Sequence, residues 1–274
     1  MAIEFTNTEL PDLIELKNIS QLYKGAKDYT IKDFNLLIEQ KPDQGQFIVL
    51  LGPSGCGKST ILRYIAGLQK PSSGEILIDA KPQTEDNRIN MIFQKYSSFE
   101  WMTVLENVEL GLKFKGVDKK ERREQAMEMI KMVELEGHEN KYAKYPTLSG
   151  GQLQRVAIAR SLLADSRTLL MDEPFGALDI NSRLRMQDRI INIWKRIHPT
   201  IILVTHDISE AVYLGDDVYI MNTNPGRLED YIHIDLPFER TRETKRTSHF
   251  IDLVRHIEDK MVALAPEAIL VDRI

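Results

Sequence analysis

Eight consecutive residues, 52–59, have the composition and spacing of a loop that holds phosphate groups. They read Gly-Pro-Ser-Gly-Cys-Gly-Lys-Ser and fit the pattern G-x-x-x-x-G-K-[ST]. Glycines let backbone N–H groups curl around phosphate oxygens, and a helix that begins there adds positive potential. We expect Lys58 to reach the β- and γ-phosphates of a nucleotide and Ser59 to ligate Mg²⁺. The residues expected to surround the phosphates are Gly52, Pro53, Ser54, Gly55, Cys56, Gly57, Lys58, Ser59 and Thr60.

Cys56 is the single cysteine of the chain, which excludes an internal disulfide and fits a reducing compartment. Its position near a helix N-terminus predicts a lowered thiol pKa. We interpret it as a small residue that lines the loop, open to modification but not catalytic.

Two adjacent acids, Asp172 and Glu173, end the apolar run of residues 168–171. Open α/β sheets bind ligands at this edge of their parallel strands. Neighbouring strand residues point in opposite directions, so the two carboxylates have different tasks if the strand continues to Glu173. We expect Asp172 to face the Mg²⁺ shell through water and Glu173 to act on an attacking water as base or orienter. Two solvated acids at a strand end are the alternative.

Residues 148–152, Leu-Ser-Gly-Gly-Gln, precede a helical segment. Ser149 and Gln152 predict a capping box, and Gly150 and Gly151 let an anion approach the exposed N–H groups. A well-capped helix without a ligand is the alternative. One nucleotide needs only one phosphate-binding segment, but this chain has two, each of which is an incomplete site. The two segments can be reconciled in a head-to-tail pair of chains, in which each chain completes its partner's site.

The segments that must position these residues alternate between strand and helix patterns. Such alternation predicts an α/β fold with a largely parallel sheet, and the Lys/Glu/Met-rich middle region predicts a helical subdomain at its side. The expected strands are residues 14–19, 31–38, 47–51, 75–79, 167–171 and 200–205, and the expected helices are residues 59–68, 119–135, 152–163 and 181–197.

Composition excludes several classes of protein. The 274 residues are 42% hydrophobic and 28% charged, which excludes a disordered chain. The net charge of −5 lacks the excess of basic residues that is typical of nucleic-acid-binding domains. No apolar run approaches the roughly 18 residues that cross a bilayer. The first 12 residues lack the pattern of a secretory signal. We therefore expect a cytoplasmic protein whose membrane role depends on a partner.

The chain becomes polar and basic from Arg240 onward and then shows one apolar helical stripe. We interpret it as a C-terminal helix docked on the core rather than on a membrane surface. The stripe consists of Phe250, Leu253, Val254, Ile257 and Met261.

The motifs and their order resemble ATP-binding cassette (ABC) ATPases over residues 14–236. Residues 148–152 match the signature sequence, which in that family closes over the γ-phosphate bound by the opposite subunit. The resemblance implies a P-loop NTPase core with a mostly parallel sheet, an antiparallel β subdomain and an inserted helical subdomain at about residues 95–162. It implies a nucleotide-binding domain over residues 1–240, and the apolar stripe beyond it predicts a helical tail over 241–274.

The resemblance also implies roles for single residues. Tyr23 resembles the aromatic that stacks on adenine. Gln94 resembles the glutamine that touches Mg²⁺ and water and senses the membrane partner. Asp179, at the end of residues 177–179, resembles part of a loop that crosses the dimer interface.

His206 resembles the switch histidine that contacts the γ-phosphate. Asp207 and Glu210 predict a D-x-x-E cap for the next helix, which leaves His206 for the ligand side. The expected catalytic residues are Lys58, Gln94, Glu173 and His206, and the expected metal ligands are Ser59, Gln94 and Asp172.

Other segments are similar to one branch of the family. Residues 175–179, Phe-Gly-Ala-Leu-Asp, are similar to bacterial import cassettes. Residues 98–108 resemble the W-x-T-V-x-x-N-V stretch of the nitrate/sulfonate/taurine import group, and residues 224–227 and 235–237 also resemble that group. Lys95-Tyr96 departs from it, since many members carry an acid or a different polar residue there.

Phe99 and Trp101 are interpreted as shaping a groove for a helix of a membrane partner, with core packing as the alternative.

These features lead to one prediction of function. We expect an ATP- and Mg²⁺-dependent subunit that energises a bacterial ABC importer for a small anion of the nitrate, sulfonate, taurine or bicarbonate type. Its expected partners are a transmembrane permease, a second ATPase subunit (a copy or a paralogue) and, indirectly, an extracytoplasmic binding protein, but no nucleic acid. It would lie on the cytoplasmic face of the inner membrane. An exporter or lipid-traffic ATPase and a soluble ABC ATPase acting on nucleic acid are the alternatives.

Overall fold

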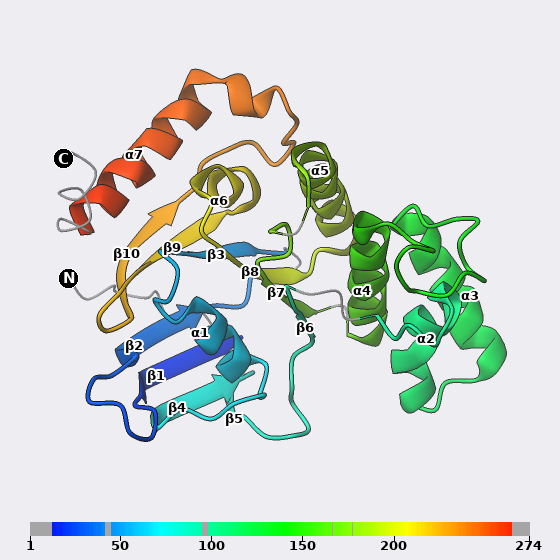
Figure 1. Ribbon diagram of the computed structural model, residues 1–274, viewed down its shortest axis with the longest axis horizontal. Coiled ribbons are helices and arrows are strands. Elements are labelled where there is room, and N and C mark those ends of the chain that lie inside the picture. Colours follow the sequence, from blue (N-terminus) through cyan, green and yellow to red (C-terminus); the bar gives the residue numbers. More distant parts are fainter. Residues whose placement is uncertain (1–12, 42–44, 95–97, 166, 177, 265–274) are drawn as a thin grey trace. The chain divides into compact units, whose positions relative to one another are not determined.

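The computed structural model describes residues 13–41, 45–94, 98–165, 167–176 and 178–264 (Figure 1). The chain divides into two compact units. The first combines Met1–Asp43, Ile48–Ile89 and Val204–Ile274, and the second combines Gln44–Phe47 and Asn90–Leu203. Each unit is described by itself.

An antiparallel sheet in the first unit has the strand order β2-β1-β4-β5. In the first half of this sheet's strand β1, Ile14 and Leu16 are buried while Glu15 and Lys17 are more exposed, as the apolar-polar alternation predicts. The alternation ends at Asn18, which has a positive φ of 50°, and the three residues after it are all buried. The strands of this sheet are drawn in blue and cyan in Figure 1. They are β1 (Ile14–Gln21), β2 (Ile31–Ile38), β4 (Ser73–Ile78) and β5 (Lys81–Pro82).

A second group of strands in the first unit leads to the phosphate loop. In β3 (Phe47–Leu51) every residue is buried, and the strand pairs in parallel with β9 (Asp217–Asn222). On its other edge, β9 pairs antiparallel with β10 (Arg227–His233). The helices of this unit are α1 (Lys58–Ile65), α6 (Ile208–Leu214) and α7 (Ser248–Leu264), with a short 3₁₀ turn, η1 (Thr244–Arg246).

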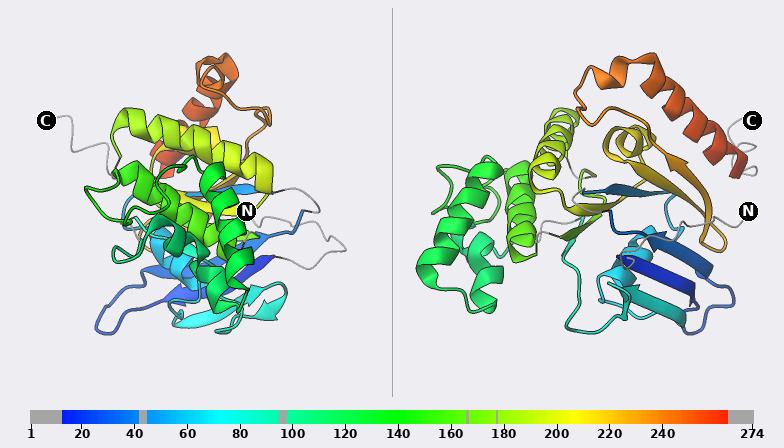
Figure 2. Two further views of the ribbon diagram at one scale, coloured as in Figure 1. Left: turned by 90° about the vertical axis from the view of Figure 1, so that its right-hand side faces the viewer. Right: turned by 180° about the vertical axis from the view of Figure 1, so that it is seen from behind.

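The second unit contains a short parallel pair, β6 (Met91–Ile92) with β7 (Thr168–Asp172), and β8 (Thr200–Thr205) lies next to β7. The green helices in Figures 1 and 2 form a bundle in which α2 packs on both α3 and α4. The helices of the unit are α2 (Val104–Phe114), α3 (Lys119–Met132), α4 (Gly150–Ala164) and α5 (Ile180–Ile197).

Close contact between α2 and α4 depends on a glycine. A Cβ atom at Gly111 would lie 2.4 Å from the Cβ of Ala164, so only glycine permits this approach. In the same unit, the Trp194 ring packs edge-on against Phe47 with 6.1 Å between ring centroids.

The α/β fold predicted from the sequence is confirmed, with both parallel and antiparallel strands. All expected strands and helices are present, with shifts of a few residues at their ends. The largest shifts are at the ends of two helices. The helix α1 ends at Ile65, before Gly67, which takes a left-handed conformation (φ 70°), and α3 ends at Met132 rather than at residue 135.

The C-terminal helix α7 packs on α6, as expected from its apolar stripe. Two residues of the stripe, Phe250 and Ile257, are buried. The segment before α7 is held by Arg240, whose buried guanidinium donates to the carbonyls of Leu214 and Gly215 at the end of α6. Among the described residues, no helix combines the length and the apolar character needed to cross a membrane.

Candidate functional site

The phosphate loop leaves the fully buried strand β3 and is shaped by glycines of the first unit. Gly55 and Gly57 have φ angles of 82° and 101°, which side chains rarely tolerate. A Cβ atom at Gly52 would lie 2.6 Å from the carbonyl oxygen of Met221 on β9. The backbone conformation of the loop is therefore set by contacts within the first unit. The glycines leave its backbone N–H groups accessible to a ligand.

Lys58 is held inside this loop. Its side chain is only 4% exposed, and Nζ donates to the carbonyl oxygens of Gly52 and Pro53 at 2.7 and 2.8 Å. The helix α1 begins directly after Gly57, which has no side chain to cap it. A cation and an uncapped helix start thus come together at one place, which is the arrangement that binds phosphate.

The thiol of Cys56 is buried, and its Sγ lies 3.8 Å from Lys58 Nζ. Burial raises the pKa of this thiol, and the nearby Lys58 charge opposes the rise without cancelling it. The lowered pKa expected from the sequence is wrong, because the closed loop removes water from the sulfur. The interpretation as a small lining residue agrees with its burial.

Tyr23 follows β1 in the first unit and is 43% exposed. Its hydroxyl accepts a hydrogen bond from Gln69 Nε2 at 3.4 Å. A ring that is fixed at its tip and half exposed can stack on a flat base. The adenine role of Tyr23 stays a prediction.

His206 is exposed at the end of β8, in the first unit. Asp207 caps α6 as predicted, since its Oδ1 accepts from the Glu210 N–H at 3.0 Å. The Glu210 carboxylate instead accepts from the Thr205 hydroxyl at 2.8 Å. The predicted cap therefore comes from Asp207. Glu210 instead links α6 to the end of β8, directly before His206.

Gln94 and Glu173 come together in the second unit. Gln94 Nε2 donates to Glu173 Oε2 at 3.3 Å. The strand β7 ends at Asp172, which is buried, and Glu173 takes a left-handed conformation with φ 43°. The condition that the strand continues to Glu173 is thus not met, and it is the turn rather than strand alternation that brings Glu173 to Gln94.

Ser149 and Gln152 form the predicted capping box at the start of α4. The Ser149 N–H donates to Gln152 Oε1 at 2.8 Å, and the Gln152 N–H donates to Ser149 Oγ at 3.3 Å. Ser149 is exposed. A Cβ atom at Gly151 would meet only Met186 Cε, at an ordinary 3.8 Å. Packing within this unit therefore does not require a glycine at position 151.

Asp179 has a local role that the motif comparison missed. It is the N-cap of α5, with Oδ1 accepting from the Ser182 N–H at 3.0 Å. Hydrogen bonds from Ser182 lower the pKa of Asp179. The D-x-x-S spacing was the signal for this cap. Ala177, in the same expected loop, lies outside the described residues.

Asn107 organises the loop that carries Trp101. Its Nδ2 donates to the carbonyls of Phe99 and Thr103 at 3.0 and 2.9 Å, while its Oδ1 accepts from the Phe99 N–H at 2.8 Å. Trp101 is 74% exposed, so core packing is wrong for this residue. Its ring lies 5.2 Å from that of Phe99. Lys95 and Tyr96 lie outside the described residues.

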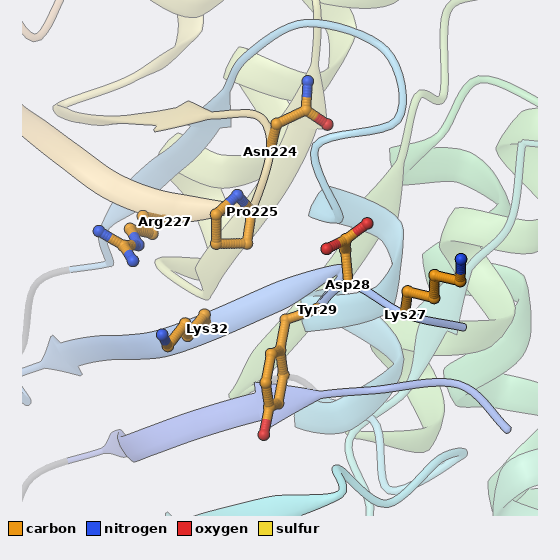
Figure 3. Close-up of a pocket in the computed structure, with 7 residues that line it drawn as sticks. All are labelled: Lys27, Asp28, Tyr29, Lys32, Asn224, Pro225 and Arg227. Atoms are coloured by element: carbon orange, nitrogen blue, oxygen red, sulfur yellow. The ribbon is translucent and has the colours of Figure 1, made fainter. Parts of the chain in front are cut away.

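A cavity of about 390 Å³ in the first unit is lined by residues other than the predicted site residues (Figure 3). The turn between β9 and β10 forms one wall, and the backbone of Gly226 joins it to β2 through bonds to Thr30 and Lys32. A Cβ atom at Gly226 would lie 2.1 Å from the carbonyl oxygen of Cys56, so this turn touches the phosphate loop. The lining residues are Lys27, Asp28, Tyr29, Lys32, Asn224, Pro225 and Arg227.

The described residues contain few side chains that could together ligate a metal ion. Among the residues that the structure describes, no group of three or more His, Cys, Asp or Glu side chains could hold a metal ion. Mg²⁺ at nucleotide sites takes one or two protein ligands and completes its shell with phosphate oxygens and water. One hydroxyl (Ser59), one amide (Gln94) and one carboxylate (Asp172) are oxygen donors of the type that such a metal accepts.

Comparison with known proteins defines the class. Residues 37–176 match the family model described as ABC transporter. The chain is 42% identical over 237 residues to the nitrate import ATP-binding protein NrtD of Synechocystis sp., covering 85% of this chain and 87% of the relative. The chain belongs to the ABC transporter family of ATP-binding subunits.

More particular likenesses lie within this family. The taurine import ATP-binding protein TauB of Pseudomonas savastanoi pv. phaseolicola is 40% identical over 251 residues, covering 89% of this chain and 94% of the relative. The dimeric structure of MJ0796, a bacterial ABC transporter cassette, matches with a TM-score of 0.68 and 34% identity, covering 82% of this chain and all of that one.

Proposed function

We propose that this chain is the ATP-hydrolysing subunit of a bacterial importer for a small anion. One observation carries the proposal: a single chain holds a finished phosphate loop with a buried Lys58 and a separate exposed helix start at Ser149. A pair of chains would use both. The names of NrtD and TauB, which are import subunits for nitrate and taurine, support import and the choice of a small anion.

The phosphate loop would bind ATP through backbone N–H groups and the start of α1. Lys58 would exchange its carbonyl partners, Gly52 and Pro53, for the β- and γ-phosphates. Its position inside the loop lowers the cost of ordering its long side chain. Ser59, Gln94 and Asp172 would hold Mg²⁺, which supplies charge neutralisation on the phosphates when bound.

Glu173 and Gln94 would place the attacking water. Their contact at 3.3 Å joins a carboxylate that can accept a proton to an amide that can both donate and accept. Glu173 would orient the water for in-line attack or take its proton. The exposed His206 would contact the γ-phosphate, and Tyr23 would stack on the adenine.

A second chain would complete the site. Its Ser149 hydroxyl and the N–H groups beside Gly150 and Gly151 would stabilise charge on the γ-phosphate. The space beside Gly151 supports this role, since a Cβ atom there would meet only ordinary contact with the described residues. Asp179 would lie in the loop that crosses between the chains. A copy or a paralogue could supply this partner.

The membrane partner would be a separate permease, with the chain peripheral on the cytoplasmic face of the inner membrane. The exposed Trp101, on a loop tied down by Asn107, offers the partner an aromatic contact on a fixed support. An extracytoplasmic binding protein would deliver the anion to the permease.

Purification with the membrane fraction tests this proposal. We expect the chain to co-purify with a polytopic membrane subunit and to drive ATP-dependent uptake of nitrate, taurine, another sulfonate or bicarbonate into proteoliposomes. Trp101→Ala is expected to weaken co-purification and keep ATP binding, while Phe114→Ala, another exposed aromatic, serves as the matched control. Recovery with nucleic acid and without a membrane subunit would contradict the proposal.

A further inference from the structure

A histidine outside every motif touches the signature segment. His138 lies in the loop between α3 and α4, and its Nε2 is 2.5 Å from Nε2 of Gln152. The loop is fixed to the start of α2, because the N–H groups of Val104 and Leu105 donate to the carbonyls of Lys141 and Glu139 at 2.9 and 3.0 Å. His138 is therefore presented to Gln152 from a rigid support.

The hydrogen-bond pattern of Gln152 fixes which atoms meet His138. Gln152 Oε1 accepts from the Ser149 N–H at 2.8 Å, so the amide NH₂ is the group that faces the imidazole. A flipped amide would set its NH₂ against the Ser149 N–H, two donors facing each other. The amide NH₂ can only donate, so Nε2 of His138 must accept and its ring hydrogen must lie on Nδ1.

One contact opposes this assignment. Lys141 Nζ lies 3.4 Å from His138 Nδ1, and an ammonium group, which can only donate, would favour the opposite tautomer. The contact to Gln152 is shorter by 0.9 Å, and both partners of that contact are partly buried, whereas Lys141 is exposed. Hydrogen bonds weaken at the longer distance, so the contact to Gln152 decides the tautomer.

We propose that His138, as the Nδ1–H tautomer, is a positioning residue that holds the signature segment in its working form. It acts through Gln152, whose amide is held between the imidazole and the Ser149 N–H. Gln152 in turn fixes the position of Ser149 through their two hydrogen bonds, and Ser149 is the exposed residue that would meet the partner's nucleotide. The structural part stands on the contacts of one unit, and the consequence for hydrolysis rests on the proposed function.

The tautomer is directly measurable. Long-range ¹H–¹⁵N spectra of the histidine rings, recorded on the whole chain without nucleotide, are expected to show a bare Nε2 and a protonated Nδ1 at His138. The exposed His256 of α7 is the comparison within the same sample. Gln152→Leu is expected to remove the preference at His138. A protonated Nε2 at His138 in the neutral ring, or no change in Gln152→Leu, would overturn the proposal.

A matched pair of variants tests the consequence for hydrolysis. His138→Phe keeps a ring but removes the acceptor, and we expect kcat to fall about three- to tenfold, the worth of one lost hydrogen bond, with KM for ATP unchanged. His138→Gln can place its amide oxygen where Nε2 was, and we expect it to retain wild-type kcat. Equal losses in both variants, or a change in KM alone, would overturn the positioning role.

The two experiments separate the possible failures. The spectra need no hydrolysis, so a wild-type chain without ATPase activity would refute the proposed function and leave the tautomer standing. If His138→Phe does not fold, the His138→Gln variant and the spectra still decide, because loss of activity in folded His138→Gln contradicts an acceptor role.

Discussion

Two helices of this protein begin at segments predicted to meet phosphate, and they begin in opposite ways. The helix α1 starts after Gly57 with no side-chain cap, whereas α4 starts at Ser149 with a reciprocal capping box. At α1 the chain supplies its own cation, Lys58, already placed in the loop. At α4 the polar side chains of the first turn are engaged with each other, and Ser149 stays exposed.

The glycines of the two segments differ in the same way. A side chain at Gly52 would strike the backbone of Met221 in its own unit, but a side chain at Gly151 would meet only ordinary contact. Packing therefore favours glycine at position 52, whereas the described residues of the second unit place no such demand on position 151. This difference supports the proposal that the phosphate loop is complete within its own chain and that the signature segment completes the site of a second chain.

Glu173→Gln should have the largest effect, because it removes the proposed base and leaves the phosphate loop intact. We expect turnover to fall by about 10²–10⁴ while ATP binding persists. Phosphate release and binding of a fluorescent ATP analogue measure the two quantities. Glu85→Gln, at an exposed surface position, is the control. Wild-type turnover in Glu173→Gln would mean that another group activates the water.

The glycine comparison gives the next prediction. Gly52→Ala is expected to lower the free energy of unfolding by about 1–3 kcal/mol through overpacking, and to weaken ATP binding. Gly151→Ala is expected to keep stability and ATP binding but to lose turnover on the order of 10- to 100-fold, because the partner's triphosphate is displaced. Urea denaturation and ATPase assays measure both. Full activity in Gly151→Ala would remove the contrast between the two segments.

The next prediction concerns Asp217, which lies on β9, the strand that packs against Gly52 of the phosphate loop. Burial alone would raise the pKa of Asp217, but hydrogen bonds from His233 and Tyr231 and the charge of Lys41 lower it on balance. A lowered pKa stabilises the fold above the pKa of the unfolded group, about 3.9, and the contribution is lost as pH falls through the folded value.

We therefore expect Asp217→Asn to lower the free energy of unfolding by about 1–3 kcal/mol at pH 7. The difference from wild type should shrink as the pH is lowered below about 4. Urea denaturation at several pH values measures it. A difference that stays constant with pH would show that the carboxylate charge is not responsible.

The smallest expected effect compares the two capping boxes of the second unit. Ser149→Ala and Thr103→Ala each remove an N-cap, and each should cost about 1 kcal/mol of stability. Only Ser149→Ala should also reduce ATPase activity, because Thr103 caps α2 and is not in the signature segment. Equal losses of activity in both variants would indicate that helix stability, rather than contact with the nucleotide, is responsible.

Features with short-range causes could be predicted from the sequence. The phosphate loop, the strands around it and the Ser149–Gln152 box depend on neighbouring residues, so spacing alone identified them. The lowered pKa predicted for Cys56 failed because the thiol's environment depends on how the loop closes over it. The position of Glu173 beside Gln94 likewise depends on a backbone turn that residue types do not specify.

Two hydrogen-bonding roles were not predicted from the sequence. Asn107 binds the backbone of a preceding loop, and His138 reaches Gln152 from a loop anchored on α2. Asn107 is the asparagine of the W-x-T-V-x-x-N-V stretch, but that resemblance did not indicate its hydrogen bonds to the loop backbone, and no pattern indicated the role of His138.

Mixing two inactive variants tests the sharing of sites most directly. Lys58→Ala removes the cation of the phosphate loop, and Ser149→Arg blocks the signature segment while leaving nucleotide binding to its own loop. A dimer with one chain of each kind has one site with an intact Lys58 and an intact Ser149. We predict that each variant alone is inactive and that the mixture regains ATPase activity. A mixture as inactive as its components, or full activity of Ser149→Arg alone, would contradict the account.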